Sequence, residues 1–252
     1  MNRFFFDKDT IIYDTVALEG DDVQHIIKVL RFEIGDKIIL CDGAGFDYLC
    51  IINSIEKNTI NFSILEKNKA LSEPEIEITL FQGIPKGEKM ELIIQKCVEL
   101  GVNKIVPVSM TRCVVKIDNE KEGKKKQERW QKIAREAAKQ CGRGIIPEVT
   151  LPLNFKSALE KSRETALRIL PYEKEYDKEN GLKNVLKSAL KENKNLKSAA
   201  ILIGPEGGFD LKEVDMAIDS GFKTITLGKR ILRTETAGFV AISCLMYESE
   251  EM

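Results

Sequence analysis

Two glycine-bearing segments near the end of the chain constrain its fold more than any other feature. The first, Ile203–Phe209, follows the apolar run Ala199–Ile203, and the second, Thr226–Ala237, follows a shorter apolar run. Asp210 and Glu213 come directly after the first segment, at a spacing typical of a capping box that begins a helix. A buried strand, a glycine turn and a helix therefore occur twice in succession. This order predicts an α/β sheet with both loops at the carboxyl ends of its strands, where open sheets bind ligands.

Glycines at strand ends allow a ligand to approach the backbone. Neither segment fits the dinucleotide fingerprint or the phosphate loop that ends in Gly-Lys-Ser/Thr. For either segment alone, an ordinary strand-to-helix turn is the simpler interpretation. Together, with Arg230, Arg233 and Glu235 on the second, they favour a ligand site. Thr234 is predicted to cap a helix whose apolar residues recur at helical spacing, namely Ala237, Val240, Ala241, Cys244 and Leu245.

The periodicity of the chain changes near residues 67–74, where polar residues precede a proline. Before this break, Asp21 or Asp22 can cap a short helix, and three strand-like runs follow at Lys37–Cys41, Phe46–Ile55 and Thr59–Leu65. Residues 1–70 are thus expected to form a small, β-rich, barrel-like domain. Strands and helices alternate over residues 75–252, which predicts a mostly parallel sheet covered on both faces.

Several elements of this second region are predicted individually. A helix should bury the apolar face of Met90–Cys97 and stop at Gly101, and residues 182–192 should form a charged helix. Trp130 falls among buried positions of a third helix, so it is expected in the core and not as a platform for base stacking.

Bulk composition fits a cytoplasmic enzyme without identifying one. The chain has 252 residues, 43% of them hydrophobic, which is enough to bury a sizeable core. No apolar stretch approaches the roughly 18 residues that cross a bilayer, so no membrane association is expected. The six cysteines are scattered without a Cys-x-x-Cys pair, which argues against a metal site or disulfides and for reduced, mostly buried thiols.

The charge is unusual for a protein that binds nucleic acid. The net charge is −1 and the pI is about 6.1, whereas such domains often have a pI above about 9. Residues 1–70 carry eight Lys and Arg against twelve Asp and Glu, and only residues 124–143 are clearly basic, with eight cations against two carboxylates. Such a run is as compatible with a solvated helix face as with a local RNA-binding patch.

The two glycine segments also carry a resemblance. Ile203–Phe209 followed by Leu227–Ala237 resembles the signature of the 16S rRNA (uracil-N3)-methyltransferases, which belong to the SPOUT superfamily of S-adenosylmethionine enzymes. Further matching strings run along almost the whole chain, at His25–Arg31, Lys86–Met90, Ile94–Lys96, Glu99–Val102, Arg129–Ile133, Glu136–Ala138 and Gln140. Each string is weak alone, but their order and number make the resemblance strong.

The resemblance implies a C-terminal SPOUT-like domain with a trefoil knot, an N-terminal PUA-like domain that helps to hold RNA, and a homodimer. Three loops would form the cofactor pocket, at Leu170–Tyr172, Ile203–Gly208 and Leu227–Thr236. The residues assigned to S-adenosylmethionine on this basis are Leu170, Ile203, Gly204, Gly208, Leu227, Gly228, Ile231, Leu232 and Thr236. The implied partner is 16S rRNA or the small ribosomal subunit, in rRNA processing and ribosome biogenesis.

The implied chemistry suggests roles for three further residues. Uracil N3 carries a proton and is a poor nucleophile, so an enzyme must orient the ring, favour its anion and remove the proton. Arg233 is our choice for the group that stabilises charge or orients the uracil. Glu206 and Glu235 are candidates for the base or for an orienting group, although Glu206 could instead fix its loop. Glu235 could simply favour a helix N-terminus, and Arg233 could pair with a carboxylate.

RNA contacts are predicted from basic residues outside the cofactor loops, namely Arg3, Lys28, Arg31, Lys86 and Arg143. Gln24 shares one expected helix face with Lys28 and Arg31, and an exposed polar stripe is an equal alternative for that face. Two other functions are weighed against N3 methylation. One is a SPOUT methyltransferase that acts on another base or on ribose, in rRNA or tRNA. The other is a non-catalytic RNA-binding protein, against which the intact glycines and Arg233 argue.

Overall fold

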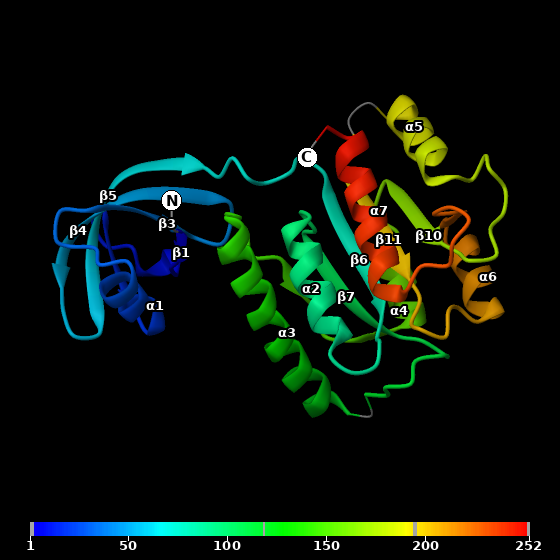
Figure 1. Cartoon of the computed structure of the whole chain (residues 1–252), viewed down its shortest axis with the longest axis horizontal. Helices are drawn as coiled ribbons and strands as arrows, with labels where there is room; N and C mark the ends of the chain where they lie inside the picture. The colour runs from blue at the N-terminus through cyan, green and yellow to red at the C-terminus, as the bar shows by residue number, and fades with distance from the viewer. Residues whose placement is uncertain (1–2, 118, 194–195, 251–252) are drawn as a thin grey trace. The chain divides into compact units, whose positions relative to one another are not determined.

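A computed structural model describes residues 3–117, 119–193 and 196–250. The chain forms two compact units (Figure 1). The first unit contains the residues up to Glu73 together with Ala138–Ile146, and the second contains Pro74–Ala137 and the chain from Pro147 onward. Each unit has its own sheet and its own hydrophobic core, and the two are described separately.

The first unit is built on a five-stranded sheet. Its strands lie in the order β1-β3-β4-β5-β2, and β1–β3 is the one parallel pair among them. The bounds are Arg3–Phe5 for β1, Thr15–Glu19 for β2, Lys37–Cys41 for β3, Phe46–Ile55 for β4 and Thr59–Lys69 for β5. The three strands predicted from the sequence are confirmed, with β5 running further than expected. Alternating side chains of these strands form the core, with Phe4, Leu40 and Phe62 among the most buried.

A short helical segment covers this core. It comprises α1, Asp21–Gln24, and a π-helical turn η2, His25–Val29, while a 3₁₀ turn η1 occupies Lys8–Thr10. Its N-cap is Gly20, at a φ of 87°, and no side chain caps it, so the prediction of a cap by Asp21 or Asp22 is wrong. Both aspartates lie inside the first turn, where they still favour the positive end of the helix.

The second unit is built on a seven-stranded sheet in which every pair among the described residues is parallel, as predicted. Its main order is β12-β10-β11-β6-β7-β8, and β9 also pairs with β7. The strands are β6 Glu77–Gly83, β7 Lys104–Ser109, β8 Glu148–Val149, β9 Leu153–Asn154, β10 Leu167–Pro171, β11 Ser198–Ile203 and β12 Lys223–Ile225. Because they are parallel, the carboxyl ends of β6, β11, β10 and β12 all meet at one edge.

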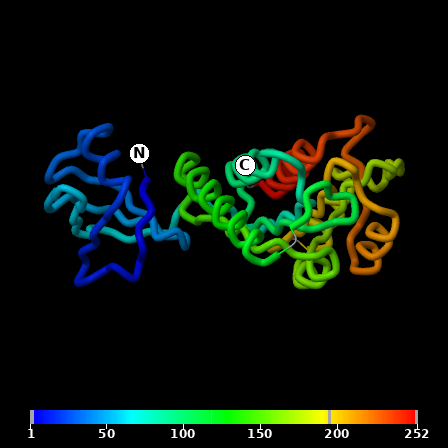
Figure 2. The backbone as a smooth tube through the Cα atoms, turned by 90° about the horizontal axis from the view of Figure 1, so that it is seen from below, coloured from blue at the N-terminus to red at the C-terminus, as the bar shows by residue number. Residues whose placement is uncertain are grey.

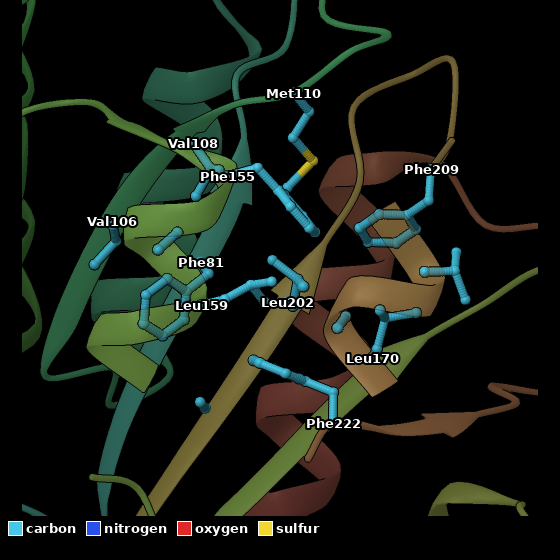
Figure 3. Packing of buried hydrophobic residues seen from close by; sticks show 14 of the residues in the cluster. Phe81, Val106, Val108, Met110, Phe155, Leu159, Leu170, Leu202, Phe209 and Phe222 are labelled. Atoms are coloured by element: carbon cyan, nitrogen blue, oxygen red, sulfur yellow. The ribbon is translucent and has the colours of Figure 1, made fainter. Parts of the chain in front are cut away.

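Helices cover both faces of this sheet (Figure 2). They are α2 Lys89–Glu99, α3 Glu120–Cys141, α4 Phe155–Ser162, α5 Leu182–Glu192, α6 Leu211–Asp219 and α7 Thr234–Glu248. On one face, α4 and α6 pack on a cluster that contains Phe81, Leu170 and Leu202 (Figure 3). On the other face, α7 packs against α2, α5 and β11. This layering is what a parallel sheet with crossover helices requires.

The local predictions in this unit have mixed outcomes. The capping box of α6 is confirmed. The side chain of Asp210 accepts a hydrogen bond from the backbone of Glu213, and the side chain of Glu213 accepts one from the backbone of Asp210. Trp130 is buried, as expected. The predicted Thr234 cap is wrong by one residue, because Arg233 is the N-cap of α7 and Thr234 turns its hydroxyl inward.

The buried face of α7 also differs from the prediction. Ala241 and Leu245 are buried as expected, but Ala237, Val240 and Cys244 are only partly buried. The other buried residues of this helix are Thr234, Gly238, Ile242 and Met246. The apolar residues of α7 occur on every side of the helix, so their spacing did not determine which side would face the core.

Three further observations concern membrane-spanning helices, cysteines and metal ligands. Among the helices that the structure describes, none is both long enough and apolar enough to cross a membrane. None of the six cysteines, all of which lie in the described ranges, forms a disulfide, and burial raises the pKa of the Cys50 thiol to about 12, which keeps it protonated and unreactive. Within the described ranges, no group of three or more His, Cys, Asp or Glu side chains could hold a metal ion.

Candidate active site

Three loops of the second unit meet where β10, β11 and β12 end. The register pairs Pro171 of β10 with Ile225 of β12, so both strands stop at the same level. The Tyr172 amide donates a hydrogen bond to the Ile225 carbonyl at 3.0 Å, which continues the ladder into the loops. The Thr226 amide donates to the Asn180 carbonyl, also at 3.0 Å. The loop after β10 is therefore held along the start of the loop after β12.

The loop after β11 lies against the other two. Gly208 has a φ of +68°, and a Cβ placed on it would lie 2.9 Å from an oxygen of Glu173, in the loop after β10. Gly204 accepts a hydrogen bond from the Thr234 hydroxyl at 2.6 Å. Since Thr234 begins α7, this bond ties the loop after β11 to the end of the loop after β12. The structure thus brings together the three segments that were predicted to bind a cofactor.

The backbone of residues 227–232 is unusually open. In the described part of the chain, its only hydrogen bonds join Gly228 to the side chain of Thr226, at 3.2 and 3.3 Å. Gly228 has a φ of +112°, a conformation that favours glycine, and no atom lies within 4 Å of the position of an added Cβ. Ile231 is 84% exposed. Unused backbone groups beside exposed apolar side chains suit a ligand that is partly aromatic and partly polar.

The remaining predicted cofactor residues differ in how accessible they are. Leu170 and Ile203 are buried at the ends of their strands, where they support the loops from beneath. Leu227, Leu232 and Thr236 are partly buried. The group therefore combines buried residues at the strand ends with more accessible residues in the loops.

The two candidate glutamates are linked by a lysine that the sequence analysis did not single out. Lys89, at the start of α2, lies 3.0 Å from a carboxylate oxygen of Glu206 and 3.8 Å from one of Glu235. The backbone amide of Lys86 also donates to Glu206, at 3.2 Å. Lys89 lies inside the Lys86–Met90 string, but its partners follow it by more than a hundred positions, so spacing alone could not reveal the contact.

The environments of the two carboxylates differ. Burial by itself would raise the pKa of Glu206, but hydrogen bonds from backbone amides and from Lys89 outweigh it and hold this pKa below its usual value. The side chain of Glu235 is 14% exposed, and its Oε2 is buried without a hydrogen bond from any described residue. Glu206 is thus a stabilised carboxylate, whereas Oε2 of Glu235 has Lys89 3.8 Å away, which is too far for a hydrogen bond.

Arg233 stands apart from these carboxylates. As the N-cap of α7 it has an extended backbone, and its side chain is exposed. Among the described residues it has no ion pair and no side-chain hydrogen bond, so the alternative of a loop-fixing ion pair is not what this structure shows. Its guanidinium is available to a ligand.

A buried glutamine was also missed by the sequence analysis. Gln82, near the end of β6, is completely buried and donates to the Thr234 hydroxyl at 2.9 Å and to the Gly83 carbonyl at 3.0 Å. Thr234 in turn donates to Gly204, so one chain of hydrogen bonds joins β6, the loop after β11 and α7. The signal was a polar side chain directly after the apolar residues Leu80 and Phe81.

The residues predicted to contact RNA have varied surroundings. Arg3 is paired with Asp47 at 2.7 Å, and Arg143 is buried and paired with Glu73 at 2.7 Å. Lys28 is exposed in η2, and the backbone of Arg31 is left-handed, with a φ of 57°.

The π-helical turn and the left-handed residue change the predicted shared face. Arg31 lies outside the regular helix that would have aligned it with Lys28, while the side chain of Gln24 bonds the Lys57 carbonyl at 3.2 Å. Lys86, in the second unit, is exposed beside the candidate active site.

Comparisons with known proteins agree with this arrangement. The family model described as an RNA methyltransferase domain matches residues 72–246, and an RNA methyltransferase PUA domain matches residues 18–65. A Bacillus subtilis protein named ribosomal RNA small subunit methyltransferase E is 37% identical over 94% of this chain and 91% of its own length.

Two solved structures are similar over nearly the full chain. One is a ribosomal RNA small subunit methyltransferase E from Neisseria gonorrhoeae bound to S-adenosyl methionine, with a TM-score of 0.81, 32% identity and coverage of 98% of this chain and 97% of that one. The other is a putative methyltransferase from Legionella pneumophila in complex with the same cofactor, with a TM-score of 0.79, 31% identity and coverage of 97% and 96%.

Proposed function

Since this chain belongs to the RNA methyltransferase family that includes ribosomal RNA small subunit methyltransferase E, we propose that it methylates N3 of a uridine in 16S rRNA, using S-adenosylmethionine. The observation that carries the proposal is the open backbone of residues 227–232, set at the carboxyl edge of the sheet directly before the exposed Arg233. A methyl donor held on one side of Arg233 and a pyrimidine on the other would place the reacting atoms together.

The residues present fit this cofactor. Backbone groups of residues 227–232 would hydrogen-bond the adenine edge, and Leu227, Ile231 and Leu232 would contact its faces. The proposed binding group also contains Leu170, Ile203, Gly204, Gly208, Gly228 and Thr236. When bound, the cofactor supplies an electrophilic methyl group on a positively charged sulfur. The positive φ of Gly228 favours glycine, and because glycine has no side chain, that part of the pocket stays open.

The chain's own residues would act on the uracil. For N3 to take the methyl group that would leave the cofactor's sulfur, the N3 proton would have to be removed. Arg233 would stabilise the negative charge that develops on the ring oxygens. We assign the proton to Glu235, directly or through an ordered water, because its buried Oε2 has no other described hydrogen-bond donor. We assign Glu206 an orienting role, since its low pKa and its bond to Lys89 make it a weak base.

The two proposed domains share the work of RNA recognition. Residues 1–70 would form the PUA-like domain and residues 75–252 the methyltransferase domain, although Ala138–Ile146 packs within the first unit. Exposed Lys28, Arg31 and Lys86 would contact the RNA directly. We retain Arg3 and Arg143 among the proposed RNA-binding residues. Unlike the three exposed residues, each is already paired with a carboxylate of its own unit.

A trefoil knot, a homodimer and a cytoplasmic location complete the proposal. The knot is supported by the path of the chain after β12, which passes the loop after β10 at Thr226 and then returns to β11 as α7. The dimer is supported by apolar side chains left exposed on α2, α7 and the loop before α7, namely Leu92, Ile231 and Tyr247. Such an enzyme would meet its substrate in the cytoplasm, during ribosome biogenesis.

Nucleoside mass spectrometry tests the reaction itself. Small subunits from a strain that lacks the gene should lack one N3-methyluridine in 16S rRNA, and the purified protein with S-adenosylmethionine should restore it. A missing methyl group on another base or on ribose would support the alternative methyltransferase. Calorimetry tests the third possibility, because a protein that binds RNA without catalysis need not bind the cofactor.

A further inference from the structure

The part of helix α3 that lies in the second unit, up to Ala137, has a buried face and a basic face on opposite sides. Gly123, Trp130, Ala134 and Ala137 are buried. With about 100° of rotation per residue, the opposite side carries Lys121, Lys125, Glu128, Lys132 and Arg135, and all five are exposed. We call these five residues the α3 stripe. Its basic residues span fourteen positions, or about 21 Å of helix.

Two cations beside this stripe are paired with carboxylates, whereas the three lysines on it are not paired with any described residue. Lys126 pairs with Glu122 at 3.7 Å, and Arg129 pairs with Glu91. Lys121, Lys125 and Lys132 have no ion pair with any residue that the structure describes. Glu128 is the one carboxylate on the stripe, and the exposed Glu136 lies at its edge. A concentrated positive charge of this kind stands out in a chain whose net charge is −1.

The side chains on the stripe determine what it can recognise. Lysines are flexible point charges that suit phosphate oxygens, whereas reading of single-stranded bases requires aromatic stacking or planar donors. The stripe carries no aromatic residue and a single planar donor, Arg135, and the indole of this helix is in the core. A straight row of lysines on a rigid helix therefore matches the regularly spaced phosphates of a structured RNA, and it would bind them independently of sequence.

We propose that the α3 stripe binds the phosphate backbone of a double-helical segment of the RNA substrate. The proposal rests on the proposed function only in its choice of RNA. It adds a contact surface on the methyltransferase unit that is separate from the three cofactor loops and from the basic residues assigned above.

The test replaces Lys121, Lys125 and Lys132 together by Gln. The matched control replaces Lys183, Lys187 and Lys191, three exposed lysines on α5, by Gln, so that both variants lose the same charge. Binding is measured without cofactor, over a range of KCl concentrations, to an RNA duplex of about 16 base pairs and to small-subunit particles. Circular dichroism and the urea midpoint verify that both variants fold.

We expect the stripe variant to bind RNA more weakly. The slope of log K against log salt should be less steep by about two to three, since each lost phosphate contact removes about 0.7–0.9 from that slope. The control variant should keep the wild-type slope. Equal slopes for the wild type and a folded stripe variant would overturn the proposal. So would a defect that appears with subunit particles but not with the duplex, because it would indicate a protein partner.

This experiment separates the stripe from the reaction. If the wild type shows the stripe-dependent slope yet forms no N3-methyluridine, the proposed function fails and the RNA-binding surface stands. If the wild type methylates uridine while the stripe variant binds RNA normally, the surface fails and the proposed function stands.

Discussion

Arg3 and Arg143 of the first unit differ from Arg233 and the α3 lysines of the second unit in what they bind. In the first unit, Arg3 and Arg143 are paired with carboxylates and largely withdrawn from solvent. In the second unit, Arg233 and the lysines of the α3 stripe are exposed, without an ion pair among the described residues. A count of basic residues therefore does not locate an RNA-binding surface. The partners of each cation decide whether it supports the fold or is available to a ligand.

The largest expected effect concerns the paired cations, which are proposed to support the fold. The Arg143 and Glu73 side chains are 4% and 6% exposed, and Glu73 also accepts hydrogen bonds from the amides of Gly144 and Ile145. Arg143→Ala should lower the free energy of unfolding by about 3–5 kcal/mol, because it leaves a buried carboxylate without its cation. Urea denaturation measures the change.

The exposed pair Lys197–Glu75 provides the control, since its side chains are 58% and 74% exposed. Lys197→Ala should cost no more than about 1 kcal/mol. If Arg143→Ala leaves the stability unchanged but weakens RNA binding, Arg143 belongs with the ligand-binding cations and the comparison fails.

The next prediction concerns an exposed cation that is available to a ligand. Arg233→Ala should reduce the single-turnover methylation rate by about 10²–10³-fold at saturating cofactor and RNA, because the charge that it stabilises develops mainly in the transition state. Its exposed side chain has no described partner, so the stability should not change. Arg233→Lys should restore little activity if planar, two-pronged donation matters. A normal rate for Arg233→Ala would direct attention to Arg230, which is also exposed.

A pH-dependent effect of smaller size is expected at Glu206. Its pKa is lowered in the folded protein, since hydrogen bonds outweigh burial. The stabilisation is therefore present above the ordinary pKa of 4.5 and is lost as the pH falls through the folded value. At pH 7, Glu206→Gln should reduce the stability by about 1.5 kcal/mol, the contribution of a hydrogen bond to a charged group. The difference from the wild type should shrink on acidification.

Urea unfolding at a series of pH values measures this prediction, with Glu160→Gln as the control. Glu160 is an exposed residue with one weak ion pair, so its replacement should leave the pH profile unchanged. A Glu206 effect that stays constant from pH 7 to pH 3 would show that the carboxylate charge plays no part.

The smallest effect is expected for the exposed cations of the first unit. Charge reversal of Lys28 and Arg31 together should weaken RNA binding and make its salt dependence shallower by about one to two, without changing cofactor affinity or stability. Filter binding over a salt series and calorimetry with S-adenosylmethionine measure the two quantities. An unchanged salt slope would assign these residues to an ordinary solvated surface, which would leave the first unit without any of its directly exposed RNA contacts.

The sequence predicted those features that depend on neighbouring residues. The strands Lys37–Cys41 and Phe46–Ile55 have the expected bounds, and so does the helix Leu182–Glu192. Their alternation or helical spacing fixes which side is buried, and short turns delimit them. The capping box at Asp210 was equally local. The family resemblance added the identity of the three loops, which periodicity alone could not have connected.

What the sequence missed depends on distant partners. Lys89 meets Glu206, Gln82 meets Thr234, and Arg143 meets Glu73, and in each case tens of residues or more separate the two side chains. Thr234 illustrates the consequence. Read locally it is a good N-cap, but its hydroxyl is engaged by Gln82 and Gly204, so Arg233 takes the capping position. Tertiary contacts override a local preference of about 1 kcal/mol.

The hydrogen-bond chain from Gln82 through Thr234 to Gly204 has a consequence for the time course of folding. Its first link joins residues 152 positions apart, and contacts of such long range form late because the entropy of closing the intervening chain must be overcome first. The ligand-binding edge should therefore mature with the docking of α7 and not with the collapse of the sheet. In a refolding experiment, recovery of S-adenosylmethionine binding would then lag behind recovery of secondary structure, and the cofactor would stabilise only molecules that have completed this last step.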